Sequence, residues 1–108
     1  MTTSVIHQPR VAWDLARTTL ALAAAGHDEY RWFAAQVERW LGRRARDEFG
    51  ETRWRLIAEE RADVHAVELG RWRVRLEDAM SRDPSLGASL AELRLDAQAR
   101  LSTSDWTL

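Results

Sequence analysis

Three polar residues in the middle of the chain have the types and the spacing that could build a site. Arg61, His65 and Glu68 follow one another at i, i+4 and i+7, so on one helix they share a face and can contact in sequence. His65 and Glu68 also form a His-x-x-Glu pair, the reverse of the Glu-x-x-His order used by di-iron bundles. Such a site needs further carboxylates from other helices, and the first predicted helix offers only Asp14 while the last offers only Glu92 and Asp96. We therefore interpret the three residues as a structural ion-pair ladder, with a metal-binding bundle as the alternative.

Arginine and tryptophan form a second candidate. All sixteen basic residues are arginine, and the chain has six tryptophans. One local cluster interleaves the two types: Arg43, Arg44, Arg46, Arg53 and Arg55 with Trp40 and Trp54. Such a cluster could stack on bases or hold phosphates. Acidic residues such as Asp47, Glu48 and Glu51 oppose it, so nucleic-acid binding is an alternative that the charge balance disfavours.

Composition excludes several classes of chemistry. The net charge is −1, which gives no general attraction for nucleic acid or anionic lipid. The chain has no cysteine, which excludes disulfides, thiolate metal sites and cysteine catalysis. No Gly-rich phosphate loop, nucleophile elbow or zinc-binding histidine spacing is present. We expect no catalytic residues, no cofactor and no enzymatic activity.

The stretch from Glu51 to Arg82 must position these residues. It holds no proline and one interior glycine, Gly70, and its pattern predicts one long charged helix of about 48 Å. At about 100° per residue its apolar residues gather in one sector: Trp54, Ile57, Ala58, Val64, Leu69, Trp72, Leu76, Ala79 and Met80. Gly70 either breaks this helix or leaves it straight, and we favour the straight helix.

Three further helices complete the prediction. The first runs from Pro9 to Ala25 before Gly26 and is the most apolar, so we expect it to be the most buried. The second begins after Asp28 and ends either at Gly42 or only before Gly50. The last follows Asp83 and Pro84 and carries leucines at helical spacing as far as Leu101. Residues 1–8 form a flexible leader, 9–101 one domain, and 102–108 a flexible tail.

The predicted fold is therefore all-α: a four-helix antiparallel bundle-like domain with one long helix over 51–82. Shorter neighbours cannot cover such a helix along its whole length. We infer that a straight helix would be covered by another subunit, and we predict a dimer or a higher oligomer.

A short segment resembles a known family. Trp40-Leu41-Gly42, followed by Ala45 and Phe49, resembles the Trp-x-Gly turn of WXG100-type small secreted proteins, which are helical hairpins. The alanine and phenylalanine fall one place later than in that family. The resemblance implies that Trp40 and Gly42 shape a turn and that the protein is exported as a dimer.

The function that the sequence favours is a small helical interaction module that self-associates or docks on a larger protein. Tryptophan and arginine are enriched at the centres of interfaces. The residues predicted for that surface are Trp32, Trp72, Arg73, Arg75 and Trp106. Residues 1–9 hold no apolar run typical of a signal peptide, and the run from Leu20 to Ala25 is too short to cross a bilayer. We therefore expect a cytoplasmic protein without a membrane partner.

Overall fold

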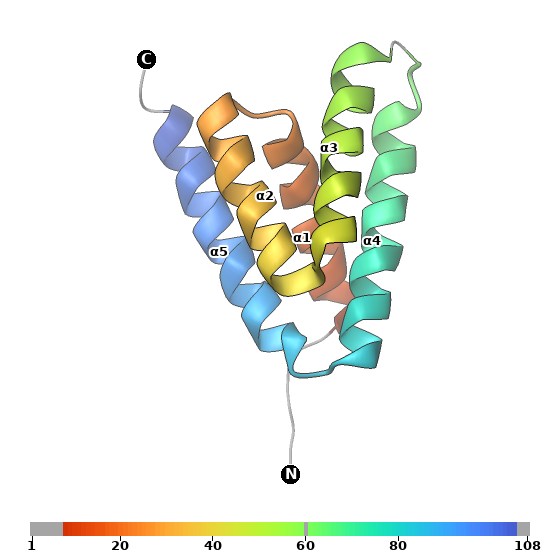
Figure 1. Cartoon of the computed structure of the whole chain (residues 1–108), viewed down its shortest axis with the longest axis vertical. Helices are drawn as coiled ribbons and strands as arrows, with labels where there is room; N and C mark the ends of the chain where they lie inside the picture. The colour runs from red at the N-terminus through yellow and green to blue at the C-terminus, as the bar shows by residue number, and fades with distance from the viewer. Residues whose placement is uncertain (1–7, 60, 106–108) are drawn as a thin grey trace.

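A computed structural model describes residues 8–59 and 61–105 of the chain. All regular secondary structure in this part is helical. It forms five helices, which are labelled in Figure 1: α1 (Gln8–Ala23), α2 (His27–Leu41), α3 (Arg43–Ala58), α4 (Val64–Arg82) and α5 (Leu86–Asp105). The all-α prediction is confirmed. The arrangement has one helix more than the four predicted, because the stretch from Glu51 to Arg82 is divided in two.

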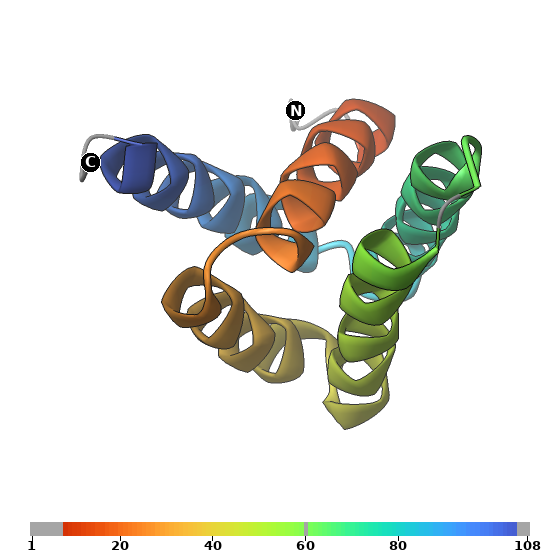
Figure 2. The same cartoon turned by 90° about the horizontal axis from the view of Figure 1, so that it is seen from above.

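Helix α1 is the central element, as its apolar sequence predicts. It contacts each of the other four helices, and in Figure 2 it lies between α5 and α4 with α2 and α3 on its other side. Its buried residues are mostly small or aliphatic: Ala12, Leu15, Ala16, Thr18, Thr19, Leu20, Leu22 and Ala23. The Thr19 hydroxyl, although buried, donates a hydrogen bond to the Leu15 carbonyl at 2.7 Å. Small side chains and satisfied hydroxyls let the neighbouring helices approach closely.

The prediction of one straight helix over residues 51–82 is wrong. Helix α3 ends at Ala58, where Glu59 has an extended backbone with φ −87° and ψ 138°, and α4 begins at Val64. Gly70 is not the break, because it lies inside α4. The chain reverses so that α4 can pack on α1, its principal neighbour. Burial of the apolar face of α4 outweighs the local preference for continuing the helix.

The reversal separates the predicted apolar sector into a buried part and an exposed part. Trp72, Leu76 and Met80 on α4 are buried. Trp54 and Ile57 on α3 are instead 65% and 64% exposed. Because α3 packs through Phe49 and Thr52, Trp54 is turned away from the core.

Gly42 ends α2 and is the only residue between α2 and α3. Its φ of 98° and ψ of 170° lie in a region that is essentially restricted to glycine. The Gly42 N–H donates to the Glu38 carbonyl at 3.0 Å, which satisfies one of the last carbonyls of α2. The choice that the sequence left open is therefore decided in favour of a helix end at Gly42.

Phe49 joins three helices in the core. Its ring stacks on Tyr30 at a centroid distance of 5.0 Å and meets Phe33 edge-on at 5.3 Å, both on α2. On the α4 side it meets Trp72 edge-on at 6.1 Å. These offset and edge-to-face arrangements are the favourable ones for aromatic rings, so Phe49 fixes α3 between α2 and α4.

Helix α5 covers the other side of α1. Leu90, Leu93 and Ala97 are buried, which confirms the predicted leucine stripe. The helix extends to Asp105, past the predicted end at Leu101. Among the residues described, no helix combines the length and the apolar character needed to cross a membrane.

Gly42 and Gly70 provide a matched pair of substitutions. A Cβ added at either glycine meets no atom within 4 Å outside its own local backbone. Gly42→Ala should lower the free energy of unfolding by about 1–3 kcal/mol, because alanine is strained at this positive φ. Gly70→Ala should raise it by up to about 1 kcal/mol, because Gly70 lies inside a helix. Urea unfolding followed by circular dichroism measures the free energy of unfolding of both variants. If Gly42→Ala left this free energy unchanged, the turn geometry would be contradicted.

Candidate interaction groove

Glu68 is the most deeply buried charged residue in the described part of the chain, with 1% of its surface exposed. Its Oε1 accepts a hydrogen bond from Thr52 Oγ1 at 2.9 Å, and its Oε2 accepts one from Arg55 Nε at 3.0 Å. Trp72 Nε1 donates to Thr52 Oγ1 at 2.8 Å. A buried carboxylate is tolerated only with such donors. The two side chains that donate to Glu68, Thr52 and Arg55, both lie on α3, so the network ties α4 to α3.

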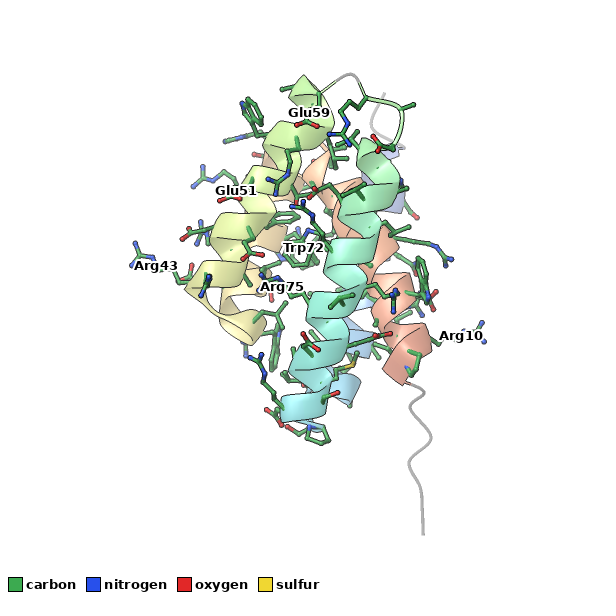
Figure 3. The ribbon with its side chains drawn as sticks, turned by 90° about the vertical axis from the view of Figure 1, so that its right-hand side faces the viewer. Arg10, Arg43, Glu51, Glu59, Trp72 and Arg75 are labelled. Carbon is green, nitrogen blue, oxygen red and sulfur yellow. The ribbon has the colours of Figure 1, made fainter. Side chains whose placement is uncertain are left out.

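An open groove follows the line between α3 and α4 outside this network. Its smaller part, about 190 Å³, lies over Thr52, Glu68 and Trp72. Its larger part, about 730 Å³, continues toward the C-terminal end of α4. Both parts are lined by Glu48, Arg71 and Arg75, which makes them one continuous feature. Figure 3 looks onto this side of the molecule and shows Trp72 and Arg75 between the two helices.

The larger part of the groove carries more positive than negative side chains. It is lined by Arg44, Arg71, Arg75 and Arg82, against two carboxylates, Glu48 and Asp78. Arg75 is occupied, because it pairs with Glu48 across the groove. Arg71 approaches Glu68 only at 3.8 Å, and 63% of its side chain is exposed.

Arg44 and Arg82 are exposed, and within residues 8–59 and 61–105 neither forms an ion pair. Leu41, Val74 and Ala79 supply apolar surface between the charges. Arginine presents several N–H donors in a planar fork that matches a carboxylate. The groove can therefore accept carboxylates together with a few aliphatic side chains.

The predicted ladder of Arg61, His65 and Glu68 does not form, because α4 begins only at Val64. Arg61 lies before the helix and pairs with Asp63, with Nη2 and Oδ2 2.9 Å apart. The hydrogen bond from Arg61 holds the pKa of the Asp63 carboxyl below its ordinary value. His65 is exposed, whereas Glu68 is buried. In the described residues no three His, Asp or Glu side chains gather closely enough to hold a metal ion.

The residues predicted for one interface lie in different parts of the structure. Trp72 is only 2% exposed and belongs to the core, while Arg75 lines the groove. Trp32 lies half-buried on the α2–α5 side, with the guanidinium of Arg100 4.0 Å from its ring centroid. Arg73 lies on the α1 side of α4, where it pairs with Glu77 and lies over Trp13. Trp106 lies outside the described residues, so its role as an anchor stays a prediction.

Arginines of the predicted arginine and tryptophan cluster contact separate parts of the protein. Arg46 pairs with Glu38, and Arg55 pairs with Glu68. Arg53 donates to the carbonyls of Ala23 and Ala25 at 2.9 Å, at the end of α1. These three side chains therefore have partners within the protein.

Sequence reasoning did not single out Arg71 and Arg82, and it assigned Arg44 to the cluster with Trp40 and Trp54 rather than to this groove. Arg71, Arg75 and Arg82 follow at i, i+4 and i+11 on one helix, so their shared face could have been recognised from spacing. Arg44 comes from α3, and only the packing of α3 against α4 brings it to the same groove.

Comparisons with family models, curated proteins and solved structures gave no match for this chain. The Trp-x-Gly resemblance predicts a turn, and Gly42 does connect two helices. The described part of the chain nevertheless packs as five helices around α1, rather than as the two-helix hairpin that the resemblance implies.

The two carboxylates that contact Arg55 should differ sharply in importance. Glu68→Ala removes the acceptor of Thr52 and Arg55 inside the protein, and should lower the free energy of unfolding by about 2–4 kcal/mol. Glu51 contacts the same arginine at 3.6 Å from an exposed position, and Glu51→Ala should change it by about 0.5 kcal/mol or less. Urea unfolding measures the free energy of unfolding of both variants. If Glu68→Ala and Glu51→Ala lowered it equally, the anchoring role of Glu68 would be contradicted.

Proposed function

We propose that this chain is a small protein-interaction module that binds an acidic, amphipathic segment of a partner protein in the groove between α3 and α4. The observation that carries the proposal is the exposed set of Arg44, Arg71 and Arg82 around Val74 and the neighbouring apolar surface. Arginine surrounding aliphatic surface is a combination that favours carboxylates and leucine-like side chains together.

Charge supports a protein segment over nucleic acid as the occupant. The groove also contains Glu48 and Asp78, which would repel the uniformly charged phosphate backbone. Trp72, the aromatic residue of the groove, is buried and offers no face on which a base could stack. A peptide can place its carboxylates beside the arginines and its aliphatic side chains beside Leu41 and Val74.

The groove stays open because of the kind of contacts that join α3 to α4 beneath it. Besides the ring contact between Phe49 and Trp72, α3 and α4 are tied by polar contacts: Thr52 and Arg55 contact Glu68, and Glu48 contacts Arg75. Helix α4 packs mainly on α1, and α3 mainly on α2. The two helices are therefore held side by side without closing over the space between them. A cytoplasmic location and the absence of catalysis remain predictions.

Binding can be measured with a fluorescein-labelled peptide that carries leucines at helical spacing and glutamates elsewhere. The double variant Arg71→Ala/Arg82→Ala should weaken binding at least about tenfold, because each lost charge-assisted contact removes one or more kcal/mol. Fluorescence anisotropy at physiological salt gives the Kd of each protein.

A matched control removes the same charge elsewhere. Arg31 and Arg94 line neither part of the groove, so Arg31→Ala/Arg94→Ala should leave the Kd within about twofold. If the two double variants lost peptide affinity equally, the peptide would be bound by non-specific charge attraction rather than in the groove. No binding by the unmodified protein, or preferential binding of a labelled oligonucleotide, would refute the proposal.

A further inference from the structure

The connection between α3 and α4 joins two helices that the local sequence favours as one. It consists of Glu59, Glu60, Arg61, Ala62 and Asp63, without glycine or proline. Glutamate, arginine and alanine are all good helix formers. The Val64 N–H donates to the Arg61 carbonyl at 3.3 Å, and the Arg61–Asp63 ion pair lies beside this turn at the surface. Exposed contacts of this kind contribute little to holding a turn.

The exposed apolar residues of α3 indicate what a second conformation of the connection would bury. On a helix continuing from α3 into α4, at about 100° per residue, Trp54 and Trp72 are five turns apart and on the same side. Phe49 and Thr52, through which α3 packs on its own core, lie on the opposite side. The protein core that receives Trp72 and Leu76 would then face Trp54. In the compact chain Trp54 is 65% exposed, and Ala58 beside it is also exposed.

A continuous helix cannot return α4 to its own α1, so that core must belong to a second molecule. We propose that the chain forms a domain-swapped dimer in which α3 continues into α4 as one helix and α4–α5 of each copy pack on α1–α3 of the other. Swapping remakes the contacts of the compact chain between two copies. It makes the connection part of one continuous helix and adds an interface around Trp54 and Ala58 of both copies. Each groove would then combine α3 of one copy with α4 of the other, so the peptide site survives exchange.

The turn geometry supplies a variant that separates the two states. Ala62 is the second residue of the turn from Arg61 to Val64, a position that favours proline, and the next residue, Asp63, has φ −94° and ψ −1°, as in a type I turn. Ala62→Pro is therefore compatible with the compact chain. In the continuous helix the same proline would disrupt the middle of the helix in both copies.

Oligomeric state is measured by size-exclusion chromatography with light scattering, after each protein is refolded from urea over a range of concentrations. The unmodified protein should give a concentration-dependent dimer. Ala62→Pro should raise the dimer Kd at least about a hundredfold, and its circular dichroism should remain that of a folded helical monomer. Asp63→Ala, which removes the ion pair and improves helix propensity, should increase the dimer fraction. Trp54→Ala should decrease it without lowering the unfolding midpoint of the monomer.

Cross-linking identifies the dimer directly, because the chain has no cysteine of its own. Glu48 and Arg75 are paired across the groove, so Glu48→Cys/Arg75→Cys can be joined by a short bismaleimide. A swapped dimer gives covalent dimers on a denaturing gel, whereas an unswapped dimer gives only cross-links within one chain. Three results would overturn the proposal: only intrachain cross-links in the dimer fraction, a dimer that Ala62→Pro does not weaken, or monomers alone for both the unmodified protein and Asp63→Ala. Each is independent of whether the groove binds the acidic peptide.

Discussion

The structure depends on how one carboxylate, that of Glu68, is accommodated away from water. A buried carboxylate must be surrounded by hydrogen-bond donors, because removing a charge from water without them is prohibitively unfavourable. Glu68 receives its close hydrogen bonds from Thr52 and Arg55, both on α3. Trp72 completes the network by donating to the same threonine hydroxyl. The requirement for these donors helps to fix the relative position of α3 and α4, two helices whose principal neighbours are α2 and α1 respectively.

The polar contacts between α3 and α4 also affect the shape of the surface above them. Apolar faces close together until little space remains, but ion pairs are satisfied at fixed distances and leave room between the helices that carry them. The seam between α3 and α4 is therefore an open groove, whereas the seams around α1 are filled by alanine and leucine. The exclusive use of arginine suits this seam, because a guanidinium can meet one carboxylate within the protein and leave donors directed outward.

The reversal between α3 and α4 shows two opposing preferences. The residues of the connection favour helix, while the apolar face of α4 is buried on α1 only if the chain turns back. In one molecule the burial of Trp72, Leu76 and Met80 decides the outcome, and Trp54 and Ile57 are left exposed. Two molecules could satisfy both preferences at once, which relates the exposed tryptophan to the helix-forming turn beside it.

The sequence by itself determined the helical class, the central place of α1 and the leucine stripe of α5, and it offered Gly42 as one of two possible ends of α2. Each follows from a periodicity or a backbone requirement that acts over a few residues. The sequence could not determine the reversal at residues 59–63, because no glycine or proline marks it. It also could not show that Glu68 would contact α3 rather than Arg61 and His65, or that Arg44 would meet Arg82 in one groove. Those outcomes were decided by the tertiary structure, because they depend on which apolar faces are buried together and on where a buried carboxylate finds its donors.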